Sequence, residues 1–543
     1  MMGEPVLSIR NLCVSFRTGR DLVPAVIDVS IDVDAGETVS VVGESGSGKS
    51  TTASAINGLL PENAVITGGS ILFDGKDTTR LHEHQLITLR GAGIGLVPQD
   101  PMSNLNPLMR VGEQIAEALE AHNYSKGKET PSRVVELLEM VGIPEPARRA
   151  KQYPHEFSGG MRQRVLIAMG LACRPRLLIA DEPTSALDVT VQARILDQLD
   201  SLTDELGTAV FLITHDLALA AERADRIVVM CQGRVVEEGV PDQILMKPVH
   251  EYTRELITAA PSLASHRVLV PRPPIPDDAV ELVCMTDVTK EFPMRGAQRA
   301  EQTKFTAVEN LSLTIRAGST VSLVGESGSG KSTTANMLLG LENVTSGTIM
   351  FDGTDLAGLS RAELLSFRRR VQPVFQNPYS SLDPRYTVED TIIEPLRVHH
   401  VGDKGSQQAR CAELLDQVAL PASFAQRLPH ELSGGQRQRV AIARALALKP
   451  DLVVLDEAVS ALDVVVQAQV LRLLAQLQED MKLSYLFISH DLSVVRMISD
   501  EVHVMRQGRI VESGTPAELF EHPQHPYTRE LLAAIPGRRL HSL

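Results

Sequence analysis

Residues 42–53 read VGESGSGKSTTA, and the same twelve letters return at residues 324–335. Later stretches match in the same order, among them FSGGMRQRV and LSGGQRQRV, which lie 275 positions apart. The ends match at that same separation, as HEYTRELITAAP and HPYTRELLAAIP. Each copy is long enough to form a domain of its own, unlike the short units of solenoids. The chain is therefore predicted to hold two fused copies of one domain.

The join between the copies is rich in proline. Residues 268–279 read VLVPRPPIPDDA. Because proline restricts φ and removes a hydrogen-bond donor, this stretch is predicted to be an extended connector. We place the first half at residues 1–262, the linker at 263–280 and the second half at 281–543.

Within each half, strand patterns alternate with helix patterns. Short apolar runs such as GETVSVVGE, RLLIADE, AVFLITHD and RIVVMCQG are typical of strands buried on both faces. The stretches VGEQIAEALEAHN and PSRVVELLEMVG have helical spacing. This alternation predicts an α/β domain with a largely parallel sheet.

The duplicated stretch contains the pattern G-x-x-x-x-G-K-S between a predicted strand and a predicted helix. Glycines let successive N–H groups turn inward, and the helix N-terminus adds partial positive charge, so the loop suits phosphate. Lys49 and Lys331 would reach the β- and γ-phosphates, and Ser50 and Ser332 would bind Mg²⁺. The alternative, a tight turn that merely happens to be rich in glycine, does not explain two copies in matched contexts.

Carboxylates follow another apolar run in each half, as Asp181–Glu182 and Asp456–Glu457. At the carboxyl end of a buried strand they would lie beside the phosphate loop, where Asp can hold Mg²⁺ and Glu can polarise water. The alternative is a helix N-cap. A histidine also follows an apolar run in ITHD and ISHD, and although such a residue is often structural, there it could sense the γ-phosphate.

A second anion-binding pattern is SGG before a helical stretch, beginning at Ser158 and at Ser433. Its hydroxyl, backbone N–H groups and helix N-terminus would suit phosphate, although an ordinary capped turn explains it equally well in isolation. One nucleotide does not need two such loops from the same domain. The excess indicates that each half serves the nucleotide of the other.

Composition excludes several classes of protein. With 43 % hydrophobic and 22 % charged residues the chain is typical of a globular protein, and its net charge of −15 disfavours nucleic acid as the main partner. The five cysteines form no C-x-x-C pair, so we expect no zinc site or iron–sulfur cluster and a reducing cytosol. We expect no membrane-spanning helix and, from the polar start MMGEPVLSIR, no secretion.

Together these motifs resemble the nucleotide-binding domains of ATP-binding cassette (ABC) proteins, over nearly the whole chain. The resemblance implies two tandem ABC-type P-loop ATPase domains, each with a RecA-like core, an antiparallel β subdomain and a helical subdomain. GESGSGKST resembles the Walker A motif, LLIADE and LVVLDE resemble Walker B, and SGG resembles the signature. Residues 185–188 and 460–463, both SALD, resemble the D-loop.

The same resemblance implies the ligands of ATP and Mg²⁺. The implied nucleotide-binding residues are Phe16, Gly43, Ser45, Gly46, Gly48, Lys49, Ser50, Thr51, Gln99, Ser158, Gly159, Gly160 and Asp181 in the first half, and Phe292, Gly325, Ser327, Gly328, Gly330, Lys331, Ser332, Thr333, Gln376, Ser433, Gly434, Gly435 and Asp456 in the second. The implied Mg²⁺ ligands are Ser50, Gln99, Asp181, Ser332, Gln376 and Asp456. The implied catalytic residues are Glu182 and Glu457, with the switch histidines His215 and His490.

In that family each ATP lies between the Walker A loop of one domain and the signature of the other. The fusion would therefore complete two composite sites. Two departures separate the halves: Met161 stands where the second half has Gln436, and Ala458 stands where the first has Pro183. Neither change removes a ligand or a catalytic acid, so both sites are expected to hydrolyse ATP.

The stretches PQDPMSNLNP and FQNPYSSLDP, with the H-x-Y-T-R-x-L tails, resemble the ATPases of bacterial, especially actinobacterial, dipeptide and oligopeptide importers. This implies an energy-coupling subunit, peripheral at the cytoplasmic face of the plasma membrane. Its partners would be two integral-membrane permease subunits, docked on residues 101–157 and 378–432, and a substrate-binding protein. Some relatives carry an iron–sulfur cluster in one tail, but residues 250–265 contain no cysteine.

Three alternatives stay open. A tandem ABC protein acting on ribosomes usually has a long, charged, helical linker, unlike the one here. A DNA-repair cassette ATPase would show zinc cysteine pairs or a coiled-coil insertion, which this sequence lacks. An importer of nickel or glutathione would share the same ATPase motifs, because cargo is selected by other proteins.

Overall fold

The computed structural model describes residues 4–184, 187–260, 276, 279–293, 304–376, 381–460 and 462–537. They divide into two compact units: unit 1, Met1–Leu263 with Pro536–Leu543, and unit 2, Ala264–Ile535. Of the predicted linker, all but Pro276, Ala279 and Val280 lie outside the described residues, as do Ser185 and Ala461 of the D-loop stretches. The predicted linker bounds therefore stay a prediction.

Unit 1 contains a mostly parallel sheet of strand order β10-β9-β3-β8-β7-β6, in which only the edge strand β10 pairs antiparallel. Its strands are β3 (Thr38–Val42), β6 (Ile94–Val97), β7 (Leu177–Asp181), β8 (Ala209–Thr214), β9 (Arg226–Cys231) and β10 (Arg234–Gly239). The predicted parallel sheet is confirmed.

A second, antiparallel sheet has the order β2-β1-β4-β5. Its strands are β1 (Leu7–Thr18), β2 (Asp21–Val33), β4 (Ala64–Phe73) and β5 (Lys76–Asp77). The helices of unit 1 are α1 (Lys49–Ile56), α2 (Glu83–Leu89), α3 (Pro101–Asn104), α4 (Val111–Ala121), α5 (Thr130–Met140), α6 (Pro146–Arg149), α7 (Gly159–Leu171), α8 (Val189–Leu206), α9 (Leu217–Arg223), α10 (Pro241–Met246) and α11 (Glu251–Ala259).

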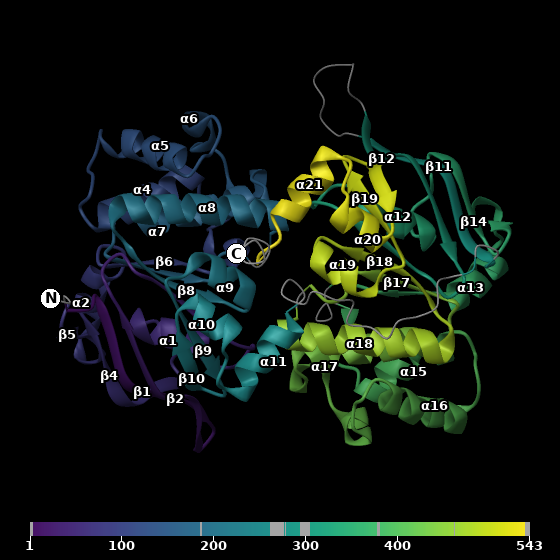
Figure 1. Ribbon diagram of the computed structural model, residues 1–543, viewed down its shortest axis with the longest axis horizontal. Helices are drawn as coiled ribbons and strands as arrows, with labels where there is room; N and C mark the ends of the chain where they lie inside the picture. Colours follow the sequence, from purple (N-terminus) through teal and green to yellow (C-terminus); the bar gives the residue numbers. More distant parts are fainter. Residues whose placement is uncertain are drawn as a thin grey trace. The chain divides into compact units, whose positions relative to one another are not determined.

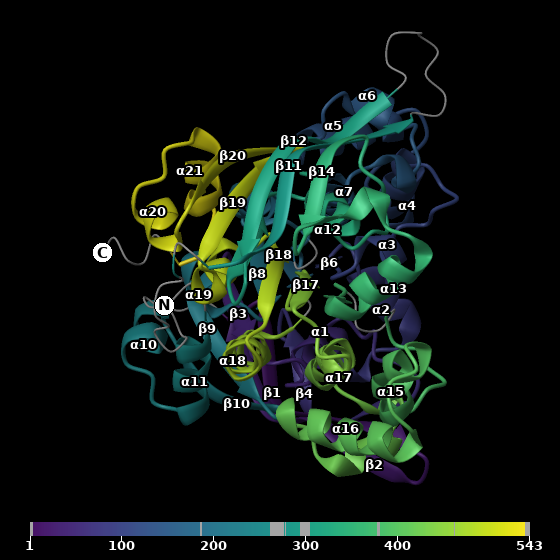
Figure 2. The same ribbon diagram turned by 90° about the vertical axis from the view of Figure 1, so that its right-hand side faces the viewer.

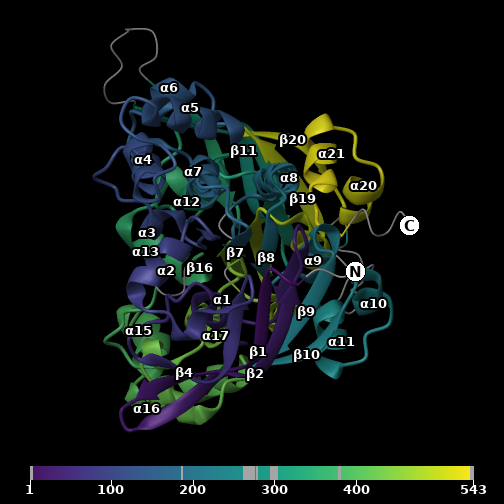
Figure 3. The same cartoon turned by 90° about the vertical axis from the view of Figure 1, so that its left-hand side faces the viewer.

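Strand β8 shows why the central strands read as continuous apolar runs. Phe211 and Ile213 join the core shared with the antiparallel sheet, whereas Val210 and Leu212 join the core shared with α4, α5 and α7. Because successive side chains point to opposite faces, a strand covered on both sides is apolar throughout. Within unit 1, α4 and α5 lie at the opposite end from β2 (Figures 1 and 3). The predicted antiparallel and helical subdomains are thus confirmed.

Unit 2 repeats this architecture, with a larger sheet of order β16-β17-β18-β13-β19-β20 and an antiparallel sheet of order β12-β11-β14-β15. Within it, α15 and α16 lie away from β11, β12 and β14 (Figure 2). Its strands are β11 (Glu281–Pro293), β12 (Lys304–Arg316), β13 (Thr320–Val324), β14 (Ser346–Phe351), β15 (Thr354–Asp355), β16 (Val371–Val374), β17 (Leu452–Asp456), β18 (Ser484–Ser489), β19 (Glu501–Arg506) and β20 (Arg509–Gly514). Its helices are α12 (Lys331–Leu338), α13 (Arg361–Arg370), α15 (Val388–Val398), α16 (Lys404–Gln417), α17 (Gly434–Leu446), α18 (Val464–Met481), α19 (Leu492–Ile498), α20 (Pro516–Glu521) and α21 (Pro526–Ala533).

The topology brings the predicted motifs of each unit to one edge of the larger sheet. Strands β3, β7 and β8 are parallel neighbours, so their carboxyl ends meet there. Val42 pairs with Thr214, and Asp181 pairs with Ile213. A search of the described helices found none with the length and hydropathy needed to cross a bilayer.

Candidate nucleotide site

The phosphate loop begins where β3 ends, at a glycine that no other residue could replace without movement. Gly43 has φ of +153°, and a Cβ there would lie 2.2 Å from the carbonyl oxygen of Met230 on β9. Gly325 is held in the same way against Met505, also at 2.2 Å. The loop then passes into α1, or α12 in unit 2, through an N-cap glycine in the left-handed region, Gly48 or Gly330.

A buried lysine occupies the centre of each loop. Lys49 is 5 % exposed, and its Nζ donates to the carbonyl oxygens of Gly43 at 2.6 Å and Glu44 at 2.8 Å. Lys331 does the same with Gly325 at 2.6 Å and Glu326 at 2.9 Å. The lysine is therefore positioned by the loop that it serves.

Each loop also contains a buried hydroxyl whose hydrogen-bonding capacity is unused. Ser47 Oγ and Ser329 Oγ are buried and have no hydrogen-bond partner among the described residues. Because buried polar atoms are nearly always paired, an unpaired hydroxyl beside a buried ammonium suits an anion. The loop therefore fits a nucleotide phosphate, and its other predicted contacts, Ser45, Gly46 and Thr51 with Ser327, Gly328 and Thr333, lie in the loop or the first turn of its helix.

The first helical turn contacts the carboxylate at the end of the neighbouring strand. Ser50 Oγ donates to Asp181 Oδ1 at 3.1 Å, and Ser332 Oγ donates to Asp456 Oδ1 at 3.3 Å. Burial raises the pKa of Asp181 more than its bond from Ser50 and the charge of Lys49 lower it, and the same balance raises the pKa of Asp456. A hydroxyl and a carboxylate oxygen side by side are ligands that Mg²⁺ prefers.

The glutamate that follows has an unusual backbone. Glu182 has φ of 43° and Glu457 has φ of 48°, in the left-handed region that costs a non-glycine residue free energy. In each unit the amide of this glutamate donates to the adjacent strand, to Ile213 O or Ile488 O, at 3.0 Å. This backbone hydrogen bond holds the turn at which β7, or β17, ends.

Gln99, predicted to bind the nucleotide and Mg²⁺, and His215, predicted to be catalytic, both meet the Glu182 carboxylate. Gln99 Nε2 donates to its Oε2 at 2.8 Å, and His215 Nδ1 lies 3.3 Å from its Oε1. Burial raises the pKa of Glu182, but the hydrogen bond and charge of His215, the charge of Lys49 and the bond from Gln99 together lower that pKa below its ordinary value. The carboxylate is thus kept ionised at neutral pH.

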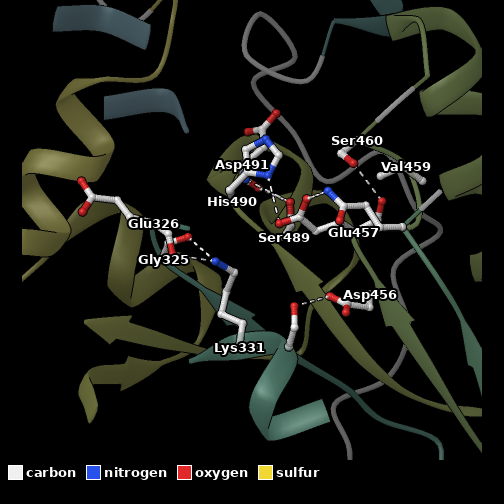
Figure 4. A network of polar contacts seen from close by, with 12 residues as sticks. Gly325, Glu326, Lys331, Asp456, Glu457, Val459, Ser460, Ser489, His490 and Asp491 are labelled. Carbon is white, nitrogen blue, oxygen red and sulfur yellow. Dashed lines mark hydrogen bonds and ion pairs between the residues drawn. The ribbon is translucent and has the colours of Figure 1, made fainter. Parts of the chain in front are cut away.

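Unit 2 repeats the arrangement, as Figure 4 shows for Lys331, Asp456, Glu457 and His490. Gln376 Nε2 donates to Glu457 Oε2 at 2.6 Å, and His490 Nδ1 lies 3.4 Å from Glu457 Oε1. The pKa of Glu457 is also lowered, because the bond and charge of His490 and the charge of Lys331 outweigh burial. Both units therefore bring together the predicted lysine, serine, aspartate, glutamate, glutamine and histidine.

The signature serines are helix N-caps. Ser158 Oγ accepts from the amide of Met161 at 3.4 Å at the start of α7, and Ser433 Oγ accepts from Gln436 at 3.3 Å at the start of α17. The second of the two following glycines packs closely against the next helix. A Cβ on Gly160 would lie 2.6 Å from Val191 Cγ1, and one on Gly435 would lie 2.3 Å from Val466 Cγ1.

The predicted role of the signature residues toward the nucleotide of the other half stays a prediction. The same holds for the adenine-stacking roles of Phe16 and Phe292. Phe16 is half-buried on β1, and Phe292, on β11, lies 4.9 Å from Lys290 Nζ in a cation–π contact. Each lies on the antiparallel sheet of its unit.

The sequence analysis missed the mutual contact of glutamine, histidine and glutamate and the left-handed turn. Gln99 and Glu182 are 83 residues apart, so no local pattern could join them. The one sequence feature that indicated this contact was that both residues follow neighbouring parallel strands.

The chain matches two protein-family models, each of them twice. The model described as ABC transporter matches residues 26–185 and 308–460. The model described as oligopeptide/dipeptide transporter, C-terminal region, matches residues 236–283 and 511–541.

Curated relatives cover nearly the whole chain. The "Glutathione import ATP-binding protein GsiA" of Escherichia coli (strain K12) is 46 % identical over 98 % of this chain and 89 % of its own length. The "Peptidoglycan transport ATP-binding protein YejF" of Agrobacterium fabrum (strain C58) is 48 % identical over 98 % of this chain and 96 % of its own. A solved dimeric bacterial ABC transporter cassette aligns with a TM-score of 0.40 and 33 % identity over 43 % of this chain and 98 % of its own. The chain belongs to the ABC transporter family, as an ATP-binding ATPase subunit with two fused cassettes, each followed by the C-terminal region of oligopeptide and dipeptide transporters.

Proposed function

We propose that this chain is the ATP-hydrolysing, energy-coupling subunit of an importer for dipeptides, oligopeptides or a peptide of the glutathione type. The observation that carries the proposal is the duplicated constellation around Glu182 and Glu457, whose distances agree within 0.2 Å between the units, at 2.8 and 2.6 Å for glutamine and 3.3 and 3.4 Å for histidine. Both cassettes are also followed by a match to the C-terminal region of oligopeptide transporters. We assign the two nucleotide-binding domains, each with its C-terminal tail, to residues 1–262 and 281–543, and the linker to residues 263–280.

The phosphate loop and its lysine bind the nucleotide. Backbone N–H groups of the loop and the buried Lys49 ammonium contact the phosphates, and Lys331 does this in unit 2. Ser50 and Asp181, with Gln99, hold Mg²⁺, as Ser332, Asp456 and Gln376 do in unit 2. The ion, when bound, neutralises charge on the phosphate oxygens.

Glu182 and Glu457 act as general bases. The lowered pKa keeps each carboxylate ionised, so it can take the proton of the water that attacks the γ-phosphate. His215 and His490 hold the carboxylate in place through their Nδ1 contacts. Gln99 donates to Glu182 and Gln376 donates to Glu457, and each glutamine directly precedes a segment that docks a permease. A change of nucleotide state at the glutamate is therefore passed to that segment through the glutamine.

Each ATP is shared between the two halves. Ser158, Gly159 and Gly160 serve the second nucleotide, and Ser433, Gly434 and Gly435 serve the first. The support is that each half carries a complete phosphate loop and an additional helix whose N-terminus is capped by a signature serine. In the Glu182→Gln, Glu457→Gln double variant, two ATP molecules should stay trapped. Spin labels on the two halves should then lie closer with ATP than with ADP, and an unchanged distance contradicts the shared site.

The partners are two integral-membrane permease subunits and, through them, a substrate-binding protein, at the cytoplasmic face of the plasma membrane. Residues 101–157 and 378–432 dock the permeases, although residues 378–380 lie outside the described residues. Exposed apolar side chains support this position: Met102 is 64 % and Leu108 is 85 % exposed just after Gln99. Cysteine cross-links from these segments to the permeases test the docking surface.

The site assignment is tested by Lys49→Ala and Lys331→Ala. Each should weaken nucleotide binding at its own site by about 10- to 100-fold, the value of one charge-assisted phosphate contact. Unchanged affinity contradicts the assignment.

The transport assignment is tested by reconstituting the chain with its permeases and binding protein. ATP-dependent uptake of a labelled dipeptide or glutathione supports it, and co-sedimentation with ribosomes instead overturns it.

A further inference from the structure

The C-terminal tail of each cassette reaches back to the phosphate loop. The amide of Glu44 donates to the hydroxyl of Tyr252 at 2.8 Å, across 208 residues of sequence. In unit 2 the amide of Glu326 donates to Tyr527 at 3.1 Å, across 201 residues. Both tyrosines are buried, Tyr252 at 9 % exposure and Tyr527 at 1 %. They belong to the H-x-Y-T-R-x-L motifs, which nothing in the ATPase chemistry explains.

The peptide unit that each tyrosine contacts is one of the two whose carbonyls accept from the lysine. The carbonyl of Gly43 accepts from Lys49 Nζ at 2.6 Å, and the N–H of that same peptide unit, on Glu44, is the one bound by Tyr252. One peptide unit is thus bound at both ends. Its rotation would move the carbonyl away from the ammonium, so the tyrosine hydroxyl fixes where the lysine lies.

The other residues of the motif place the tyrosine. The Glu237 carboxylate on β10 accepts from the amides of Val249 at 2.8 Å and His250 at 3.0 Å, which holds the turn before α11. His250 then caps α11, since its Nδ1 accepts from the amide of Tyr252 at 3.2 Å. Arg254 Nη2 donates to Val249 O at 2.9 Å and closes the turn from the other side.

Unit 2 builds the same support from the residues at the equivalent positions. Glu512 accepts from Gln524 at 2.7 Å and His525 at 3.1 Å, and His525 Nδ1 accepts from Tyr527 at 3.2 Å. The motif thus repeats its contacts 275 residues later, and the equivalent tyrosine bonds to the equivalent peptide unit of the phosphate loop.

We propose that Tyr252 and Tyr527 are positioning residues for ATP binding: each hydroxyl locks the peptide unit that orients the phosphate-loop lysine, and so links the C-terminal region to the nucleotide site of its own cassette. The proposal rests on the function proposed above for the phosphate loops. Removing the hydroxyl leaves a partly buried N–H without its acceptor and frees the peptide unit to rotate.

The test uses Tyr252→Phe and Tyr527→Phe in the full chain, each with the other site disabled by Lys331→Ala or Lys49→Ala. Titration calorimetry with MgADP, which cannot be hydrolysed, should show affinity about 5- to 20-fold weaker at the altered site. The matched control is Tyr485→Phe. Tyr485 is also 1 % exposed and its hydroxyl donates to Leu474 O at 2.8 Å, but it pairs with Thr320 at the start of β13, whereas the loop follows the other end of that strand, at Val324. This control should lower the melting temperature and leave both affinities unchanged.

Amide hydrogen exchange supplies a readout that general destabilisation would not reproduce. In Tyr252→Phe, exchange should speed up at Glu44 and stay unchanged in the loop of unit 2. Peptides that start upstream of the loops are distinguishable, because Val41 stands where unit 2 has Leu323.

The outcomes separate the two proposals. If Lys49→Ala weakens MgADP binding and Tyr252→Phe does not, the positioning role is overturned and the proposed ATP site stands. If Lys49→Ala itself has no effect, the proposed site fails first. If both Tyr→Phe variants behave like Tyr485→Phe, with a lower melting temperature and unchanged affinity, the tyrosines are structural and the proposal is overturned.

Discussion

The two units agree closely at the site and differ in the cores that support it. The lysine contacts measure 2.6 and 2.8 Å in unit 1 and 2.6 and 2.9 Å in unit 2. The glutamine-to-glutamate bonds measure 2.8 and 2.6 Å, and the histidine-to-glutamate contacts 3.3 and 3.4 Å. The same side chains therefore make the same contacts, at nearly equal lengths, in both units.

Away from the site, unit 1 has a buried arginine paired with two aspartates at a place where unit 2 has a buried isoleucine. Arg223, with a side chain only 9 % exposed, pairs with Asp197 at 2.6 Å and Asp200 at 2.7 Å. The residues 275 positions later are Ile498, Arg472 and Ala475, of which Ile498 is fully buried. The difference teaches that packing between α8 and α9, or α18 and α19, tolerates either chemistry as long as the gap is filled.

Unit 2 has its own buried ionisable group. His503 on β19 stands where unit 1 has Val228 on β9. Its Nδ1 lies 2.7 Å from Ser513 Oγ, and burial lowers the pKa of the imidazole to about 4. The two units should therefore respond differently to acid.

The largest effect is expected from the general bases. Replacing both carboxylates, by Glu182→Gln and Glu457→Gln, should lower ATP turnover by about 10²–10⁴-fold, since glutamine keeps the size but cannot take a proton. Each single variant should keep the turnover of the unaltered site. Phosphate release measures both. If one single variant abolishes turnover while the other does not, the two sites are unequal, which contradicts the equivalence that their matching contacts predict.

The second effect is a pH dependence confined to unit 2. The unfolded chain protonates this histidine near its ordinary value of 6.5, and the folded unit only near 4, so between these values the unfolded state binds more protons. Stability is therefore complete above about pH 6.5 and falls, as pH drops toward 4, by up to about 3 kcal/mol. Calorimetry should show the unit 2 transition shifting in acid, and His503→Val should remove this part of the shift. A shift that persists in that variant would argue against the assignment.

The third effect concerns the charged cluster of unit 1. Arg223→Ile should destabilise unit 1 by about 1–3 kcal/mol, less than a fully buried pair would lose because Asp197 is 54 % and Asp200 is 39 % exposed. Adding Asp197→Arg and Asp200→Ala rebuilds the unit 2 version and should restore most of the loss. The unit 1 melting transition measures both steps, and failure of the triple variant to recover would show that the two cores are not interchangeable.

The smallest effect is expected at the signature helices. In unit 2 the amide of Ser433 donates to Gln436 Oε1 at 3.0 Å, which completes a capping box that Met161 cannot form in unit 1. Met161→Gln should add about 0.5–1 kcal/mol to the stability of unit 1, and Gln436→Met should remove a similar amount from unit 2. Calorimetry of the reciprocal pair checks this, and equal shifts of both transitions in either variant would contradict a local cap.

The strands of the larger sheets and the phosphate loops were predictable because their signals are local. Apolar runs such as AVFLITHD follow from burial on both faces, and the phosphate loops follow from the spacing G-x-x-x-x-G-K-S between a predicted strand and a predicted helix. Placing the aspartates beside the loop needed one further step, the rule that parallel strands end at a common edge. These features could be read from the letters because each depends on a residue and its near neighbours, or on topology alone.

The duplication, the α/β fold class and the identities of the lysine, serine, aspartate, glutamate, glutamine and histidine of each cassette could all be predicted from the amino-acid sequence. Only the tertiary structure decided that Gln99 and His215 meet on Glu182, that this glutamate has left-handed φ, and that Tyr252 bonds to Glu44. These contacts join residues far apart in the chain. Their geometry depends on how β7, β8 and α11 pack against one another, and no periodicity within a single element carries that information.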